Sequence, residues 1–389
     1  MKKILVCLLA ICMLLSGCKK TVQEPSETMY GVWVATTKNL DFPSRAGLSE
    51  SQISAETDQI IDTAVSCGIN CIFLQVCANA DAIYPDALFG CAASVYGTRN
   101  PEKELKTDIL AEFLEKAHQK NIKVYAWINP YRVGSGEADE IVKSLGQTHP
   151  LYGRDDLLLK YSGGVCMNPG VPETRELVLA MIREIVERYK VDGVVFDDYF
   201  YPYERDYDDS ETYQKYGANF KTVDNFRRYS VNRLISRCSE YLREKGVPFG
   251  VSPFAIWQNK SEDAAGSDTN GLCSYSAIYS DSRLWVQKEW VDFISPQIYW
   301  SFENEKAGFE QVFDWWNDLC EDTNVALYVS HYVSRIGSEL AGWESSEQLA
   351  RQLSLCSKKN VCSGSVFFRI GDFIKNEYNE VECVKKYKY

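Results

Sequence analysis

Two adjacent carboxylates, Asp197 and Asp198, follow a short apolar run at residues 194–196 and precede a cluster of aromatic residues. An uninterrupted apolar run is typical of a strand that is buried on both faces of a parallel sheet. Acids at the carboxyl end of such a strand lie where α/β sheets and barrels place their sites. Carboxylates beside aromatic rings suit a sugar, whose C–H faces stack on rings while its hydroxyls need polar partners. The pattern predicts a glycan-cleaving site; the alternative is that both acids only cap the following helix or loop.

Apolar segments of strand type alternate with helical patterns along the chain, and they predict the elements that must position these acids. The expected strands cover residues 31–36, 70–76, 123–129, 193–197, 248–254, 291–300, 325–331 and 363–369. The clearest helices are expected at 52–66, 220–244 and 309–319, after an N-cap at Thr107, from Pro172, and from a capping box made by Ser345 and Gln348. The stretch that ends at Met167 is rich in glycine and charge and receives no element. The alternation predicts one α/β domain, a single (β/α)8 TIM barrel.

The carboxyl ends of barrel strands carry the chemistry, so polar and aromatic residues at these ends are candidates for substrate binding. They are Gln75, Asn129, Tyr131, Arg132, Tyr199, Tyr201, Trp257, Gln297, Tyr299, Trp300 and His331, with Asp268 in the loop after the fifth strand. For His331 a structural hydrogen bond is the alternative, whereas Trp33, Trp127 and Phe367 are expected to pack in the core. The rim lacks glycine-rich phosphate turns, and the chain has no Gly-x-Ser-x-Gly elbow, which argues against a Ser-His-Asp hydrolase.

Glycoside cleavage needs two carboxyl groups in most enzymes, one to protonate the leaving oxygen and one to attack or to activate water. Asp197 is the first candidate for the nucleophile or base. If its side chain points into the barrel mouth, strand alternation turns Asp198 aside. The second carboxyl is expected from Asp81 or Asp198, ranked equally, with Asp268 behind them.

Composition narrows the possible partners. The formal net charge of −12 repels polyphosphate, so we do not expect nucleic acid to bind. Of the 14 cysteines, three lie within the first 18 residues, which leaves an odd number and no pairing with zinc spacing. We expect no metal and no cofactor, and a monomer that acts on a glycan.

The amino-terminal residues resemble a bacterial lipoprotein signal. Lys2 and Lys3 precede an apolar run, and small residues come directly before Cys18. We expect residues 1–17 to be removed, Cys18 to carry a lipid that anchors the chain to a bacterial membrane, and residues 18–28 to form a tether. Residues 29–389 then form the barrel domain, in the cell envelope and facing the periplasm or the exterior.

Eight segments together resemble the glycosyl hydrolase-like 10 family. They are residues 31–44, 127–133, 167–178, 191–203, 251–257, 266–269, 295–300 and 365–369. The resemblance implies a barrel of the glycoside-hydrolase type that cleaves O-glycosidic bonds of peptidoglycan glycan strands or a related polysaccharide. Residues 87–93, in the loop after the second strand, depart from the family pattern. A catalytically impaired glycan-binding pseudoenzyme at the cell wall is therefore the alternative, with a lipid-anchored structural partner of wall-remodelling proteins as a third possibility.

Overall fold

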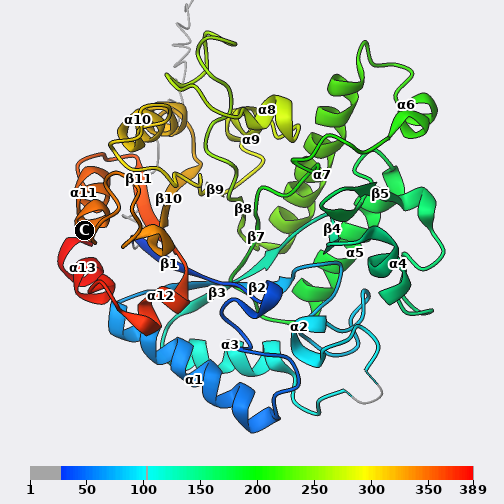
Figure 1. The fold of residues 1–389 in the computed structure, drawn as a ribbon, viewed down its shortest axis with the longest axis horizontal. Coiled ribbons are helices and arrows are strands. Elements are labelled where there is room, and N and C mark those ends of the chain that lie inside the picture. The colour runs from blue at the N-terminus through cyan, green and yellow to red at the C-terminus, as the bar shows by residue number, and fades with distance from the viewer. Residues whose placement is uncertain (1–27, 102–103, 389) are drawn as a thin grey trace, which may run out of the picture.

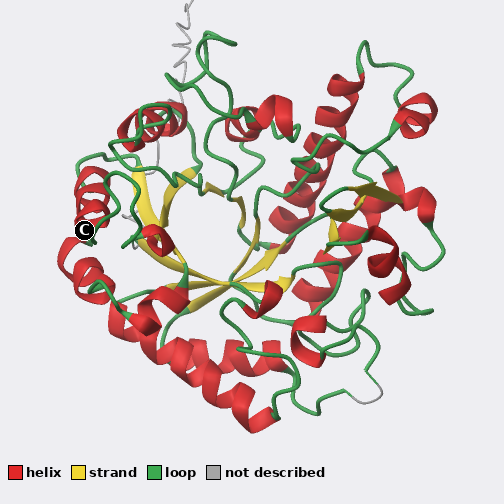
Figure 2. Cartoon of the chain, viewed as in Figure 1, coloured by secondary structure: helices red, strands yellow, loops and turns green. Residues whose placement is uncertain are grey.

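Eight parallel strands close into a barrel in the computed structural model, which describes residues 28–101 and 104–388. Their order around the barrel is β1-β11-β10-β9-β8-β7-β3-β2, and Figure 2 shows them as a central ring. They span β1 Met29–Val34, β2 Cys71–Cys77, β3 Lys123–Ile128, β7 Gly193–Phe196, β8 Phe249–Val251, β9 Phe293–Ile294, β10 Ala326–Tyr332 and β11 Cys362–Phe368. Each lies within or overlaps one of the eight expected strands, and the predicted TIM barrel is confirmed.

Helices surround the ring of strands (Figure 1). The longer ones are α1 Glu50–Cys67, α3 Ile109–Gln119, α5 Pro172–Arg188, α7 Val223–Lys245, α10 Phe309–Cys320 and α11 Glu347–Cys356. Shorter ones are α2 Ala93–Tyr96, α4 Ala138–Ser144, α6 Ser210–Tyr216, α8 Ser274–Ala277, α9 Ser282–Gln287, α12 Ile370–Lys375 and α13 Glu380–Tyr387, with 3₁₀ turns η1 Thr37–Asn39, η2 Asp155–Leu157 and η3 Val333–Arg335. The apolar stripes of the long helices face the strands, which buries most of the core between the two layers.

Two expected helix starts are wrong in detail. Asp108, not Thr107, caps α3, because its side chain accepts the N–H of Ala111 at 3.0 Å. The expected capping box at α11 is absent, since the N-cap residue of that helix makes no side-chain cap bond. Gln348 instead donates to Glu303 at 2.9 Å, so this side chain ties α11 to the loop after β9.

A small sheet interrupts the barrel after β3. It consists of β4 Arg132–Ser135, β5 Leu158–Tyr161 and β6 Gly164–Met167, which pair antiparallel in the order β4-β6-β5. Figure 1 shows it beside α4 and α5, outside the ring of strands. The sequence did not predict these strands because they are short and lie among glycines and charges, where two-residue alternation is weak. The sheet holds the chain on both sides of Arg132, which reaches the barrel mouth.

The barrel interior is filled by aromatic side chains, as expected for a closed eight-stranded core. Trp33 packs edge-on against Phe73 and Trp127, with ring centroids 4.7 and 4.8 Å apart. Below them Phe73 stacks on Tyr125 at 5.4 Å and lies 6.0 Å from Phe293. These rings pack together in the barrel interior, with Trp33 and Trp127 nearest to the mouth of the barrel.

The acids at the amino ends of the strands have a structural task. Asp192 accepts the N–H of Val124 at 2.7 Å, and Asp292 accepts the N–H of Phe249 at 2.8 Å. Each carboxylate therefore pairs a backbone donor where the neighbouring strand begins. Asp192 and Asp292 thus stabilise the amino-terminal end of the barrel, away from the mouth.

Candidate active site

A cavity of about 280 Å³ opens at the carboxyl ends of the strands. Its walls are aromatic and polar, and they come from β1, β2, β3, β4, β10 and β11 and from the loops after β1, β7 and β9. The lining residues are Trp33, Ala35, Thr37, Leu40, Gln75, Trp127, Arg132, Asp197, Asp198, Tyr199, Gln297, Tyr299, Tyr332 and Phe368. Asp197 and Asp198 are the acidic residues among the described residues that line it. This is where the topology of a parallel barrel places a site.

Asp197 is buried and accepts three hydrogen bonds from N–H donors. Its Oδ2 accepts from Trp127 Nε1 at 3.1 Å and from the side-chain amide of Asn129, and its Oδ1 accepts the N–H of Tyr199 at 3.2 Å. None of these donors can reverse its role, so all three favour the ionised carboxylate. The hydrogen bond from the N–H of Tyr199 closes a local turn. Asp197 therefore both caps its loop and lines the cavity.

A chain of amides fixes Asn129 in this role. The N–H groups of Thr36 and Thr37 donate to Gln75 Oε1 at 2.9 and 2.8 Å, and Gln75 Nε2 donates to Asn129 Oδ1 at 2.6 Å. The Asn129 amide nitrogen must therefore face Asp197. The sequence predicted Gln75 and Asn129 as substrate contacts. The structure uses both to orient Asp197, and of the two only Gln75 also lines the cavity.

Asp198 also faces the cavity, contrary to the expectation from strand alternation. Strand β7 ends at Phe196, so the two acids lie beyond the ladder that imposes opposite directions on neighbours. Asp198 accepts hydrogen bonds from Gln297 Nε2 at 3.0 Å and from the hydroxyl of Tyr203. The two carboxyls thus have separate sets of donors, taken from opposite sides of the mouth.

Burial and mutual repulsion shift the titration of this pair. Desolvation, followed by the charge of Asp198, raises the pKa of Asp197 to about 7, while Arg132 opposes the shift. Burial likewise raises the pKa of Asp198, against the hydrogen bonds from Tyr203 and Gln297. Two buried carboxylates repel each other, so ionisation of one makes the other hold its proton more strongly. Such a pair can supply an acid and an ionised carboxylate to one reaction.

Arg132 and Tyr199 form one wall of the mouth. The guanidinium carbon of Arg132 lies 4.8 Å from the centroid of the Tyr199 ring, and Arg132 also donates to Ala78 and Asn129 at 2.9 and 3.0 Å. The Tyr199 ring is exposed, so its free face can stack on a sugar. Both residues are therefore placed for the substrate contact that the sequence predicted.

The other two candidate acids lie away from the cavity. Asp81 is buried and accepts the N–H of Asn79 at 3.0 Å, within its own loop after β2. Asp268 is exposed, and the neighbouring Ser267 and Thr269 bond to the loop after β8. Neither acid belongs to the cavity lining. Of the three candidates for the second carboxyl, the structure brings only Asp198 to Asp197.

Four predicted contact residues are placed in the protein core instead. Tyr131 and Tyr201 are almost completely buried, because the chain after each strand folds back under the mouth. The indole of Trp257 donates to Asp281 at 3.0 Å and stacks on Trp315. The remaining residue, His331, bonds to Gln352 and Ser365 at 2.8 and 3.0 Å, and burial lowers its pKa to about 4. His331 thus makes structural hydrogen bonds, which is the alternative considered for it from the sequence.

Several residues at the mouth were not predicted to be there. Trp33 and Trp127 line the cavity although both were expected to be core, and Trp127 also donates to Asp197. Tyr203 reaches back five residues to Asp198. The aromatic cluster after Asp198 was the one signal for Tyr203. Tyr332 was not predicted because β10 continues one residue past the expected strand, and Phe368 lies within the expected last strand but was not singled out as a site residue.

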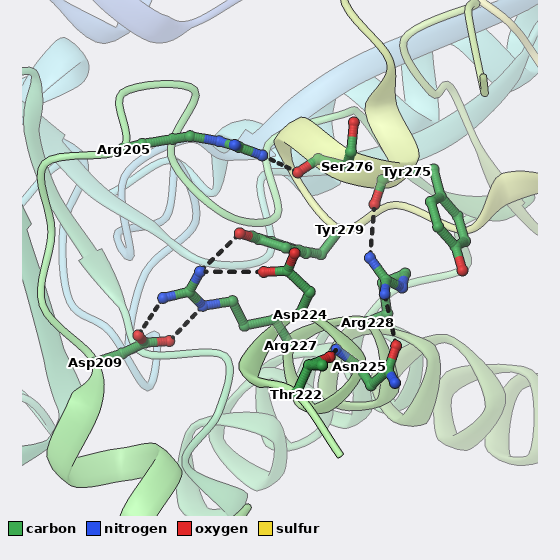
Figure 3. Close-up of polar contacts among 10 residues, drawn as sticks. All are labelled: Arg205, Asp209, Thr222, Asp224, Asn225, Arg227, Arg228, Tyr275, Ser276 and Tyr279. Carbon is green, nitrogen blue, oxygen red and sulfur yellow. Dashed lines mark hydrogen bonds and ion pairs between the residues drawn. The ribbon is translucent and has the colours of Figure 1, made fainter. Parts of the chain in front are cut away.

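An ion pair outside the mouth holds the loop that carries Tyr199 and Tyr203. Arg227, near the start of α7, donates to Asp209 and, at 2.7 Å, to the hydroxyl of Tyr279 (Figure 3). Asp209 is buried, so this pair is shielded from solvent. The loop after β7 is thereby fixed to the loop after β8, which keeps the Tyr203 hydroxyl on Asp198.

The described part of the chain contains no cluster of three or more His, Cys, Asp or Glu side chains that could hold a metal ion. The polar groups at the mouth include two carboxyls, three amides and one guanidinium, which form one hydrogen-bonded set around Asp197 and another around Asp198. This donor set suits proton transfer and the binding of hydroxyl groups.

Comparisons with known proteins agree with this geometry. Residues 28–344 match the family model "Glycosyl hydrolase-like 10". The chain is 32% identical to "Glycosyl hydrolase YngK" of Bacillus subtilis over 361 residues, which cover 91% of this chain and 70% of that protein. It is 33% identical to "Glycosyl hydrolase DigH" of Escherichia coli K12, covering 93% and 91%.

The fold is similar to that of the PgaB (BpsB) glycoside hydrolase domain from Bordetella bronchiseptica. The TM-score is 0.61 at 15% sequence identity, and the match covers 93% of this chain and 99% of that domain. This likeness shows a common fold, whereas the family match and the two relatives rest on sequence. The chain is therefore a glycosidase that belongs to the glycosyl hydrolase-like 10 family.

Proposed function

We propose that this protein cleaves O-glycosidic bonds in the glycan strands of peptidoglycan or a related polysaccharide, with Asp197 and Asp198 as its catalytic carboxyls. The observation that carries this proposal is the position of both buried acids on the wall of one aromatic cavity at the barrel mouth. Paired carboxyls are what glycoside hydrolysis needs, and the rings of Trp33, Tyr199 and Tyr299 offer faces for a sugar.

The proton that the pair holds supports the first chemical step. The protonated carboxyl gives its proton to the leaving glycosidic oxygen as the bond to the anomeric carbon breaks. The ionised carboxyl then faces the positive charge that develops on the sugar ring. Whether it attacks the carbon or activates a water determines the anomer of the product, which proton NMR of the first-formed sugar measures directly.

The amino terminus supports a wall substrate. We propose that residues 1–17 are removed, that Cys18 carries a lipid, and that residues 18–28 tether the barrel to a membrane surface in the cell envelope. Residues 1–27 lie outside the described residues, so this proposal rests on the sequence pattern at Cys18. No helix in the part of the chain that the structure describes is long and apolar enough to span a bilayer. Metabolic labelling with a fatty acid, lost in Cys18→Ala, tests the anchor.

The substrate is tested with purified sacculi. The wild-type protein is expected to release soluble glycan fragments with new reducing ends, detected by chromatography and mass spectrometry. Sacculi whose peptides have been removed enzymatically test whether the glycan alone is recognised. Binding to sacculi without release would assign the protein as a glycan-binding pseudoenzyme and contradict the proposed hydrolysis.

A further inference from the structure

The cavity beside Asp197 continues into a second, larger hollow on the same face of the barrel. The second hollow has a volume of about 690 Å³, and Tyr299 and Tyr332 line both spaces. The rings of these two tyrosines lie 4.7 Å apart at an interplanar angle of 33°, so together they form the ridge between the spaces. A substrate that passes over this ridge occupies both.

The second hollow is built by the loops after β9 and β10. Trp300 lies in the loop after β9. Arg335 is the last residue of the turn η3, which follows β10. Leu340 is exposed at the edge, and the buried Trp343 forms part of the wall. Along the barrel, β8 is the strand between β9 and β7, and the catalytic pair follows β7. Because Tyr299 and Tyr332 line both spaces, the two together offer room for more of a glycan than the first cavity alone.

The charged side chains of the second hollow differ in whether they already have a polar partner. Glu303 is already bonded to Arg351 and Gln348 outside the hollow, and Glu305 is exposed. Arg335 lies with its guanidinium carbon 4.9 Å from the centroid of the Tyr332 ring. Within residues 28–101 and 104–388, no carboxylate lies within ion-pair distance of Arg335, and its side chain makes no hydrogen bond.

A guanidinium stacked on a ring at the ridge is oriented while its donors stay open. Such a group matches the two oxygens of a carboxylate better than any single hydroxyl. Lys306 adds a second cation to the lining of this hollow, which also includes the exposed Glu305 and Glu303, whose carboxylate is already paired with Arg351. The hollow thus favours an anionic substituent although the whole chain is acidic.

We propose that the second hollow binds the sugar next to the cleaved bond and that Arg335 binds a carboxylate on that sugar. This inference rests on the proposed function, because it takes the occupant of the hollow to be the continuation of the same glycan. A uronic acid carries the required group, and so does a sugar with a lactyl ether whose carboxyl is free, as in peptidoglycan strands from which the peptides have been removed.

The test separates binding from cleavage. In an Asp197→Asn background, calorimetry measures the Kd of a peptidoglycan-derived oligosaccharide and of the same compound with its carboxylates reduced to alcohols. We expect the acid to bind about 10- to 100-fold more tightly, as a charge-assisted bidentate contact provides. Adding Arg335→Gln should remove the difference and leave the affinity for the reduced compound unchanged. Arg283→Gln is the matched control, because Arg283 also stacks on a ring, 5.2 Å from the centroid of Trp257, but does not line either space.

Equal affinity for the acid and the reduced compound, or an Arg335→Gln variant that keeps the preference, overturns the inference. A uronate oligosaccharide measured in parallel distinguishes the two sources of the carboxylate. If wild-type protein shows the Arg335-dependent preference but releases no fragments from any glycan, the proposed hydrolysis fails and the carboxylate site stands. If fragments are released without the preference, the proposed hydrolysis stands and the carboxylate site fails.

Discussion

The side-chain amide of Gln297 donates to Asp198 at 3.0 Å and, with its other hydrogen, to the carbonyl of Ser252 at 2.9 Å. This amide connects the segment after β9 to the acid after β7 and holds Asp198 from the side opposite Tyr203. Because the donor stabilises the ionised form, it lowers the pKa of Asp198 against the effect of burial.

Replacing Gln297 with leucine tests this contact. The loss of the donor raises the pKa of Asp198, so the alkaline limb of the pH profile of kcat/KM, which reports the loss of the proton from the acid, should move to higher pH. We expect kcat/KM at neutral pH to fall about 10- to 100-fold, the value of a hydrogen bond to a charged group. Gln119→Leu, an exposed change on α3, is the control. A lower rate with an unmoved pH profile would contradict a role in tuning Asp198.

The raised pKa values of Asp197 and Asp198 predict that these two carboxyls lower the free energy of unfolding of the protein at higher pH. A carboxyl whose pKa is higher in the folded than in the unfolded state destabilises the protein progressively as pH rises from the unfolded value toward the folded one. Asp198→Asn removes that charge, and its amide can still accept from Gln297 and donate to Tyr203. We expect this variant to be more stable than wild type by about 1–2 kcal/mol at pH 8.

The same comparison at pH 4 serves as the internal control. Because the raised pKa leaves Asp198 more often protonated at pH 4 than at pH 8, the difference in free energy of unfolding should be smaller at pH 4. Thermal unfolding at both pH values measures it. Equal differences at pH 4 and pH 8 would show that packing, and not charge, explains the effect.

A buried ion pair fixes the loop after β1 against the end of β11. The carboxylate of Asp41 is completely inaccessible; it accepts the N–H of Ala35 at 2.9 Å and of Gly371 at 3.0 Å, and it pairs with Arg369. Arg369→Met leaves this carboxylate buried without its cation, which should cost about 3 kcal/mol at pH 7. Burial raises the pKa of Asp41 and Arg369 opposes that shift, so the loss of Arg369 raises the pKa further. Asp41 then takes up a proton more readily, and the cost should shrink near pH 4.

Urea unfolding at both pH values measures this change, with the exposed Arg45→Met as the control. Turnover should fall as well, because Leu40 and Phe368, which line the cavity, flank the two paired residues. Unchanged stability in Arg369→Met would mean that Asp41 is held well enough by its backbone donors alone.

The cysteines are predicted to be inert in the native protein. All eleven described cysteines are buried, and burial raises the pKa of the Cys67 thiol to about 11 and of the Cys320 thiol to about 12. A thiol reagent should therefore leave the eleven unmodified in native protein and modify all eleven after denaturation. Rapid modification of a subset without loss of structure would contradict their burial.

The alternation of strand and helix patterns was enough to predict the barrel, because both periods recur around eight repeats. The position of Asp197 followed from the strand that precedes it. The direction of Asp198 did not, since it depends on where the β7 ladder ends, and apolar residues alone do not show that point.

Contacts between distant residues could not be predicted either. The chain of amides from Thr36 through Gln75 to Asn129 depends on the order of the strands in the closed barrel. The second hollow gave no signal, because Lys306 and Arg335 become neighbours only when the loops after β9 and β10 meet. Because these two cations are far apart in the sequence, the sequence pattern did not show a basic patch.

The central claim is that Asp197 and Asp198 together perform glycoside cleavage. It is tested most directly by the rate at which wild type, Asp197→Asn and Asp198→Asn form reducing ends from one glycan substrate, with binding measured on the same samples. We predict that each variant binds the glycan but cleaves it at least about 10³-fold more slowly, the loss expected when a group that acts in the transition state is removed. Cleavage by either variant within about tenfold of wild type would contradict the claim.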